Sequence, residues 1–150
     1  MSELRLRIAK SADVSLLLGM MEPFNALEGI PWNEPAKERA LRALLAGPEL
    51  GLVAVLDGSE GALGYFVLTW GYDLEWDGRD AFLTELFLIP TARGSGNGSR
   101  ALRAIERLAR EHGARALHLM VQHENTVARR LYTSHGYTSP PRLFLSKALE

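Results

Sequence analysis

Hydrophobic and polar positions follow two periods along the chain, and each period predicts a different kind of element. Apolar residues at every second position, or in a short continuous run, predict strands, whereas apolar residues three and four positions apart predict helices. In chain order the pattern predicts a strand at 4–8, a helix capped by Ser11 and disturbed at its end by Pro23, a helix at 35–46, strands at 50–56, 63–70 and 81–89, a helix at 101–112, a strand at 117–121, a helix at 127–135, and short final strands at Tyr137 and at 143–145.

The middle three strands follow one another with only turns between them, which predicts an antiparallel meander. Helices and a further strand come after it, so the sheet should be mixed. No internal repeat, low-complexity tract or linker interrupts the 150 residues. We therefore expect one α/β domain that covers 1–150.

Composition narrows the class of protein. Hydrophobic residues make up 47% of the chain, which is typical of a globular domain, and a formal net charge of −1 argues against binding to nucleic acid or to an acidic membrane surface. The chain has no cysteine, which excludes disulfides and thiol nucleophiles, and its four histidines form no metal-ligand pattern. No signal peptide or membrane-spanning run is evident, so a cytoplasmic location is expected.

A glycine-rich stretch between a predicted strand and a predicted helix carries the strongest chemical signal. It contains Arg93, Gly94, Gly96 and Gly98. Glycines leave backbone N–H groups uncovered, and a helix N-terminus adds partial positive charge, so this stretch is suited to bind phosphate; a simple tight turn is the alternative. It is neither a dinucleotide fingerprint, because Ser99 occupies the last glycine position, nor a Walker loop, because it has no lysine.

The pattern Arg93-x-x-Gly96-x-Gly98 resembles the pyrophosphate loop of the GCN5-related N-acetyltransferases, which bind acetyl-CoA. A second motif, with Asn125, Ala128 and Tyr132 followed by Gly136-Tyr137, is similar to a helix of the same family. The predicted order of elements also resembles that fold. The resemblance implies a single-domain GNAT-like α/β fold, with a mixed, largely antiparallel twisted sheet flanked by about four helices.

The resemblance also implies which residues bind acetyl-CoA as a cosubstrate. Backbone groups of the strand before the loop would pair with the pantetheine arm, and the N–H of Leu88 would hold the thioester oxygen. The implied residues are Phe87, Leu88, Ile89, Arg93, Gly94, Ser95, Gly96, Asn97, Gly98, Ser99, Asn125, Ala128 and Tyr132. Asn125 has a second interpretation as a helix cap.

Two residues are candidates for proton transfer. Tyr132 lies seven residues after Asn125, so both can share a helical face, and its phenol would donate to the departing thiolate. The alternative is a core tyrosine. Glu85 stands within an apolar run, where burial would raise its pKa and suit it to act as a base, directly or through water. Its alternative is a structural or solvent-facing carboxylate.

By the same resemblance the acceptor would lie between the first two helices and the middle strands. The implied residues mix aromatic rings with carboxylates, which suits a cation: Phe24, Asn25, Glu28, Trp32, Tyr72 and Glu75. We therefore expect an N-acetyltransferase that acts on a primary amine of a small molecule by direct attack, with no metal. Alternatives are a peptide or protein acceptor, or a non-catalytic acyl-CoA sensor or accessory subunit, and a homodimer is left open.

Overall fold

The structure is a computed structural model that describes residues 3–150. These residues form two compact units, one ending at Met120 and the other spanning Val121–Glu150, and each is described by itself. The elements are those of an α/β protein with a five-stranded mixed sheet and four α-helices among the described residues, which confirms the predicted fold class. The assignment of 1–150 to one domain stays a prediction.

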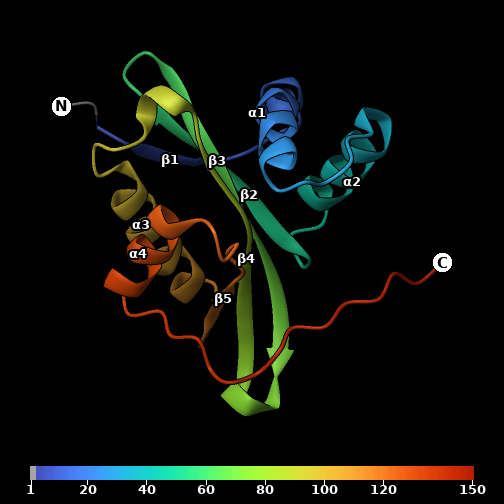
Figure 1. Ribbon diagram of the computed structural model, residues 1–150. Helices are drawn as coiled ribbons and strands as arrows, with labels where there is room; N and C mark the ends of the chain where they lie inside the picture. The colour runs from blue at the N-terminus through green and yellow to red at the C-terminus, as the bar shows by residue number, and fades with distance from the viewer. Residues whose placement is uncertain (1–2) are drawn as a thin grey trace. The chain divides into compact units, whose positions relative to one another are not determined.

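The sheet of the first unit is built from β1 (Arg5–Ile8), β2 (Gly51–Gly58), β3 (Gly61–Asp73), β4 (Gly78–Leu88) and β5 (Leu117–Leu119). The strands lie side by side in chain order (Figure 1). Every neighbouring pair is antiparallel except β4 and β5, which are parallel. The predicted meander of β2, β3 and β4 is therefore confirmed, and the sheet is mixed because a helix connects β4 to β5.

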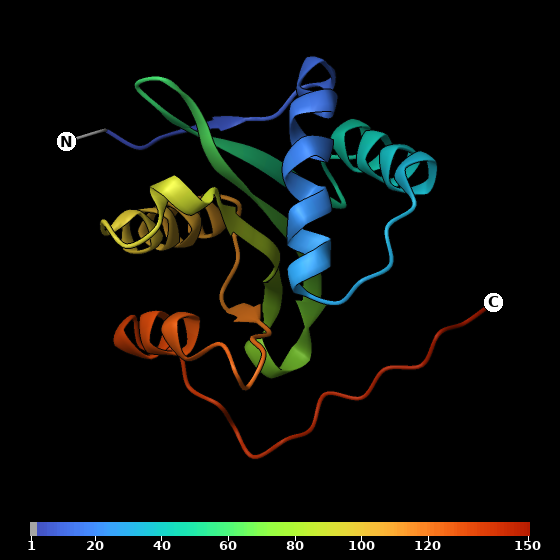
Figure 2. The ribbon, with the colours of Figure 1, turned by 45° about the horizontal axis from the view of Figure 1, so that its top comes forward.

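The two faces of this sheet are covered by different helices. Helices α1 (Val14–Leu27) and α2 (Glu34–Ala46) lie on one side, and α3 (Asn97–Glu111) lies on the other (Figures 1 and 2). Residues directly opposite each other on neighbouring strands share a face, so Val55, Tyr65 and Phe87 point the same way. All three are buried with α1 and α2, and we call this side of the sheet the α1–α2 face.

A β-bulge in β4 decides which residues reach the α1–α2 face. Glu85 pairs with Val67, but Leu83 pairs with the next residue of β3, so Thr84 is an extra residue in β4. Phe82 pairs with Thr69, two residues from Val67, and therefore shares the face of Glu85. Without the extra residue, Phe82 and Glu85 would point to opposite faces.

Strand β1 is an edge strand fixed by ion pairs. The Nε of Arg7 donates to Asp57 at 2.6 Å, and its Nη1 donates to Asp13 at 2.9 Å. A backbone hydrogen bond from Lys10 and the guanidinium of Arg7 lower the pKa of Asp13, although burial opposes them. The edge strand is thus tied both to β2 and to the residues that lead into α1.

The start and end of α1 differ from the prediction. Ser11 is not the cap, because a short 3₁₀ helix, Ser11–Asp13, precedes α1. Pro23 lies inside α1, which continues to Leu27. Proline in a helix interior removes one backbone hydrogen bond, but the turn after Pro23 buries Asn25 and packs Phe24 against Tyr65. Tertiary packing therefore outweighs the local preference to stop.

The second unit contains α4 (Thr126–Ser134), which confirms the last predicted helix. The short final strands predicted at Tyr137 and at 143–145 were wrong, since residues 137–150 form no strand. Leu143 and Leu145 are 87% and 84% exposed. Alternation of apolar residues makes a strand only where a neighbouring strand accepts its hydrogen bonds, and this segment has no such ladder in the structure.

Candidate active site

The glycine loop, residues 93–99, joins β4 to α3 through the 3₁₀ turn Pro90–Ala92. Gly94 and Gly96 have φ angles of 79° and 82°, which side chains rarely adopt, and Gly96 is the N-cap of α3. Within residues 3–150 the backbone N–H groups of 94–98 meet no backbone acceptor. A row of free N–H groups at a helix N-terminus is a binding site for anions such as phosphate.

Side chains of the loop stabilise it from within. The buried Asn97 donates from Nδ2 to the carbonyl of Ala92 at 3.0 Å. Arg100 donates from Nη1 to the Ser95 carbonyl and to Asn97 Oδ1, both at 3.0 Å. Arg93 turns back toward β4 instead, where its Nε donates to the Leu88 carbonyl at 2.8 Å. The anion-binding groups of the loop are therefore backbone groups, with Arg100 as the nearest side-chain cation.

The second half of β4, from Glu85 to Leu88, has one edge that β5 does not reach. The β4–β5 ladder ends where Leu83 pairs with Leu119. The N–H of Ile89 donates to the Leu63 carbonyl of β3, and successive backbone groups of a strand point to alternate edges. The N–H of Leu88 therefore points to the uncovered edge. An extended ligand can add to such an edge as a strand does.

Glu85 lies on the α1–α2 face and binds Tyr65. The Tyr65 hydroxyl donates to Glu85 Oε1 at 2.6 Å, and Tyr65 is fully buried. Burial raises the pKa of the Glu85 carboxyl, while the Tyr65 hydrogen bond and the charge of Lys37 lower it. Burial also raises the pKa of Tyr65, together with the charge of Glu85, so its hydroxyl stays a donor. Such a carboxyl can exchange protons closer to neutral pH than an ordinary one.

Aromatic rings surround this hydrogen bond. Phe24 meets the Tyr65 ring edge-on with 6.3 Å between centroids, and the Phe87 ring lies 6.0 Å away. On α2, the Lys37 ammonium lies 6.0 Å from the ring centre of Trp32. The sequence analysis missed Tyr65 and Lys37. A polar-tipped ring among the apolar residues of β3 was the available signal for Tyr65, whereas Lys37 stood in an ordinary charged helix face.

The predicted acceptor residues do not all share one surface. Phe24 and Trp32 pack against the core of the α1–α2 face, and Glu28 is exposed after the end of α1. Asn25 is buried, with Nδ2 donating to the Met21 carbonyl at 2.7 Å, so it faces the protein interior.

The remaining two acceptor residues come from the far end of the β3–β4 hairpin. Tyr72 is 77% exposed, and its position opposite Arg79 assigns it to the sheet face opposite Glu85. Glu75 is exposed in the 3₁₀ turn Leu74–Trp76. Of the six predicted residues, Phe24 and Trp32 therefore pack on the face that carries Glu85, and Phe24 contacts the ring of Tyr65.

The candidate residues of the second unit lie on α4. Asn125 is the N-cap, and its Oδ1 accepts from the N–H of Ala128 at 3.1 Å, so the capping interpretation is confirmed. Tyr132 is half-buried, and its ring meets that of Tyr137 edge-on at 5.8 Å. A role of these residues toward CoA stays a prediction.

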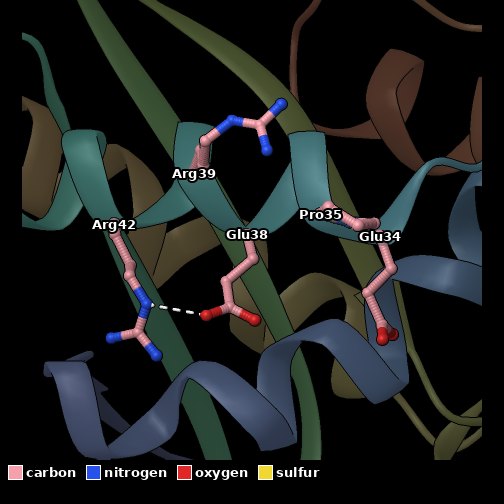
Figure 3. A pocket seen from close by; sticks show the side chains of 5 residues that line it. All are labelled: Glu34, Pro35, Glu38, Arg39 and Arg42. Carbon is pink, nitrogen blue, oxygen red and sulfur yellow. Dashed lines mark hydrogen bonds and ion pairs between the residues drawn. The ribbon is translucent and has the colours of Figure 1, made fainter.

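A surface hollow lies on α2, away from the predicted residues. Figure 3 shows its lining side chains, all from one helix, with an ion pair of 2.9 Å between Arg42 Nε and Glu38 Oε2: Glu34, Pro35, Glu38, Arg39 and Arg42. This exposed i,i+4 pair is a common helix-surface feature, and we assign the hollow no role.

Residues 3–150 also contain no candidate metal site and no candidate membrane helix. In that part of the chain, no three histidine, aspartate or glutamate side chains gather where they could hold a metal ion. None of its helices is both long enough and apolar enough to cross a membrane.

Comparison with known proteins identifies the family. Residues 17–137 match the family described as "Acetyltransferase (GNAT) family", so the chain belongs to that family. The uncharacterized N-acetyltransferase YhfO of Bacillus subtilis (strain 168) is 28% identical over 89% of each chain. A thialysine N-epsilon-acetyltransferase of Mus musculus is 26% identical over 91% of this chain and 85% of the relative. The prediction of an N-acetyltransferase enzyme is thereby confirmed.

Solved structures agree in fold. An integron cassette protein from the mobile metagenome of Cole Harbour Salt Marsh has a TM-score of 0.85 and 31% identity, over 97% of this chain and 90% of the other. A protein of Clostridium acetobutylicum described as a predicted acetyltransferase, solved with acetyl-CoA, has a TM-score of 0.80 and 19% identity, over 97% of this chain and 96% of the other. The second likeness concerns the fold alone.

Proposed function

We propose that the protein transfers an acetyl group from acetyl-CoA to a primary amine of a small molecule, by direct attack of the amine in a ternary complex. The observation that carries this proposal is the sequence of features along β4. A half-buried carboxylate at Glu85 is followed by an uncovered strand edge and then by a loop rich in free N–H groups. Membership in the acetyltransferase family supports the same reaction.

The groups that would bind CoA fit that ligand. The N–H groups of 94–98 and the guanidinium of Arg100 suit its phosphates, and the uncovered edge at Leu88 suits its amide-bearing arm. Bound acetyl-CoA supplies an activated acyl group. The N–H of Leu88 would stabilise the charge that develops on the thioester oxygen.

Two side chains would move protons. Glu85 takes the proton from the acceptor ammonium, directly or through water, and the freed nitrogen attacks the acyl carbon as the C–S bond breaks. The phenol of Tyr132 donates a proton to the departing sulfur. The chain contains no cysteine that could carry the acetyl group, which favours direct attack. The product is an amide, and its nitrogen has lost two protons. Glu85 takes the first before attack, and the second leaves the tetrahedral intermediate through water, which balances the proton that Tyr132 gives to sulfur.

The acceptor follows from the charges and rings near Glu85. Phe24 and Trp32 offer aromatic surface on the α1–α2 face, and the carboxylate of Glu85 favours a cation, although the charge of Lys37 acts on the same carboxylate. The mouse relative is named for acetylation of an amine of thialysine, which agrees with an amine acceptor. We also propose a cytoplasmic location.

The test is a screen of small amines, peptides and protein N-termini for thiol release from acetyl-CoA, with the acetylated product identified by mass spectrometry. A small primary amine should be turned over faster than any peptide. Faster turnover of a peptide would show that the acceptor is a peptide or protein and not a small molecule. Tight CoA binding without turnover of any amine would instead identify a sensor or accessory protein. Sedimentation in the same buffer would test the homodimer.

A further inference from the structure

A second polar pair lies on the α1–α2 face, at the first half of β4. His118 of β5 is directly opposite Phe82, and Asp80 lies two residues before Phe82 on β4, so all three share one face. The bulge in β4 gives Phe82 the same face as Glu85. Asp80 and His118 are therefore on the side of the sheet that carries the proposed base, although neither belongs to the predicted acceptor residues.

The pair holds its histidine in one tautomer. His118 Nε2 lies 3.0 Å from Asp80 Oδ2, and the two side chains are 34% and 14% exposed. A carboxylate only accepts hydrogen bonds, so Nε2 carries the hydrogen. In the neutral imidazole Nδ1 is then an acceptor, and no residue among 3–150 donates to it. With the imidazole neutral, the pair presents the negative charge of Asp80 and an acceptor nitrogen.

The space for this carboxylate depends on a glycine. Gly71 of β3 is directly opposite Asp80, and a Cβ at Gly71 would overlap Asp80 Oδ1. The carboxylate therefore lies over the backbone of β3, in space that any side chain at Gly71 would fill.

Aromatic rings and an absence of nearby ion pairs complete the site. The rings of Trp76 and Phe82 lie 6.1 and 6.2 Å from the His118 ring. Arg79 points to the other face, where it stacks on Trp70. The Arg115 side chain lies 3.1 Å from the place that a Cβ at Gly78 would take, so this cation lies on the face of Asp80, two residues along β4. Within the described residues, Asp80 forms an ion pair with no group other than His118. A carboxylate, a lone-pair nitrogen and ring faces together suit an ammonium group.

The register gives the spacing between this site and Glu85. On β3, Val67 lies opposite Glu85, and Thr69, two positions further along, lies opposite Phe82. Gly71, which lies opposite Asp80, is four positions from Val67. These steps correspond to about 7 and 13 Å along the strand. A flexible chain of several methylene groups spans such a distance.

We propose that Asp80 and His118, with Trp76, bind a second ammonium group of the acceptor and thereby select elongated diamines. This inference rests on the proposed function and names its substrate class. An acceptor with one nitrogen at Glu85 and the other at this pair would be held at both ends. A carboxylate at the far end would meet the charge of Asp80 and be disfavoured.

The experiment compares straight-chain diamines of increasing length with alkyl monoamines and ω-amino acids of matched length, by kcat/KM. In the wild type the kcat/KM of the best diamine should exceed that of its matched monoamine by at least about tenfold, with an optimum at intermediate length.

Asp80→Asn should reduce this ratio at least about tenfold, mainly through KM, and Gly71→Ala should reduce it by displacing the carboxylate. His118→Phe, which keeps a ring, should reduce it too. Asp77→Asn, an exposed turn residue with the same change of charge, should preserve the ratio.

Several results would overturn the inference. The first is an equal kcat/KM for diamines and monoamines in the wild type. The second is an equal fall of kcat/KM for both kinds of amine in Asp80→Asn, and the third is a higher kcat/KM for ω-amino acids than for diamines. Turnover of monoamines in any of these cases would leave the proposed function standing. If no amine is turned over, calorimetry of diamines with the protein–CoA complex decides instead. Binding that weakens about tenfold in Asp80→Asn supports the site, and no binding refutes it.

Discussion

The two halves of β4 are built from one strand but offer different chemistry. The first half, Gly78 to Leu83, pairs with β3 throughout and also with β5 at its last three residues, where only side chains are available to a ligand. The second half pairs with β3 alone and leaves backbone groups uncovered on its other edge. The proposals above therefore assign the two halves different tasks: backbone groups would bind the cosubstrate, and side chains on the α1–α2 face would select and deprotonate the acceptor.

The bulge at Thr84 separates the two halves. Phe82 and Glu85 are three residues apart and would point to opposite faces in a regular strand, but the bulge gives them the same face. Side chains from both halves of β4 can therefore line one site. A ligand on the backbone edge and a ligand on the face can therefore approach the same strand from two directions. Four predictions test this division, beginning with the largest expected effect.

Glu85→Gln should lower kcat/KM about 100- to 10,000-fold below the pKa of the acceptor amine, because it removes the proposed base. The dissociation constant of CoA should not change. Burial raises the pKa of Glu85, so ionising this carboxyl costs more free energy in the folded state than in the unfolded state. The melting temperature of the variant should therefore be no lower than that of wild type. Glu60→Gln, in an exposed turn, is the control, and wild-type rates in Glu85→Gln would make Glu85 structural.

Tyr132→Phe should lower kcat about 10- to 1,000-fold, because it deletes the proposed general acid and keeps the ring that packs against Tyr137. The affinity for acetyl-CoA should change little, since the lost interaction grows in the transition state. The alkaline limb of the wild-type rate profile should flatten in the variant. Tyr137→Phe is the matched control from the same ring pair. An unchanged kcat and alkaline limb would leave water as the proton source.

Gly96→Ala should weaken CoA binding about tenfold, measured by calorimetry, because a side chain would change the loop whose N–H groups bind phosphate. Gly113→Ala is the matched control: Gly113 has a φ of 87°, close to the 82° of Gly96, and lies at the other end of α3. Both variants carry similar backbone strain, of roughly 1–2 kcal/mol. Equal CoA affinity in the two variants would refute the assignment of the loop.

Tyr65→Phe should give the smallest effect, a shift in the pH profile. The Tyr65 hydrogen bond lowers the pKa of Glu85, so its loss should raise that pKa further. Less of the base is then ionised at a given pH, and the acid limb of kcat/KM should move to higher pH. Rates well above the limb should stay close to wild type. The same substitution in a Glu85→Gln background should cause no shift, whereas a shift there would assign the limb to another group.

The sequence predicted the order of elements because each period of apolar residues matched one kind of element. It did not predict the bulge at Thr84, since only the pairing of β4 with β3 reveals the extra residue. It also predicted final strands at Tyr137 and 143–145 that the structure lacks, because alternation describes a strand's faces but not its partner. For the same reason the helix end at Pro23 was misplaced, since contacts of Phe24 and Asn25 lie far away in sequence.

The site was predictable where one contiguous segment forms it. Residues 93–99 form the glycine loop, and their spacing already indicated an anion site. The side-chain site instead joins residues from α1, α2, β3 and β4. Tyr65 and Glu85 are hydrogen-bonded although twenty residues separate them, and the Asp80–His118 pair spans thirty-eight. Such pairs have no local signature, so only the register of the sheet could reveal them.

The ion pairs of β1 also bear on how the protein behaves at high concentration. An edge strand exposes unpaired N–H and C=O groups that can join the edge of another molecule and start aggregation. In β1 the side chains of Arg5 and Arg7 are exposed, and the bonds of Arg7 to Asp57 and Asp13 hold one of these charges at the rim. A neighbouring molecule that docked on this edge would have to desolvate those arginines. The edge thus carries its own protection against intermolecular β-sheet growth, and neutralising Arg5 and Arg7 together would remove it.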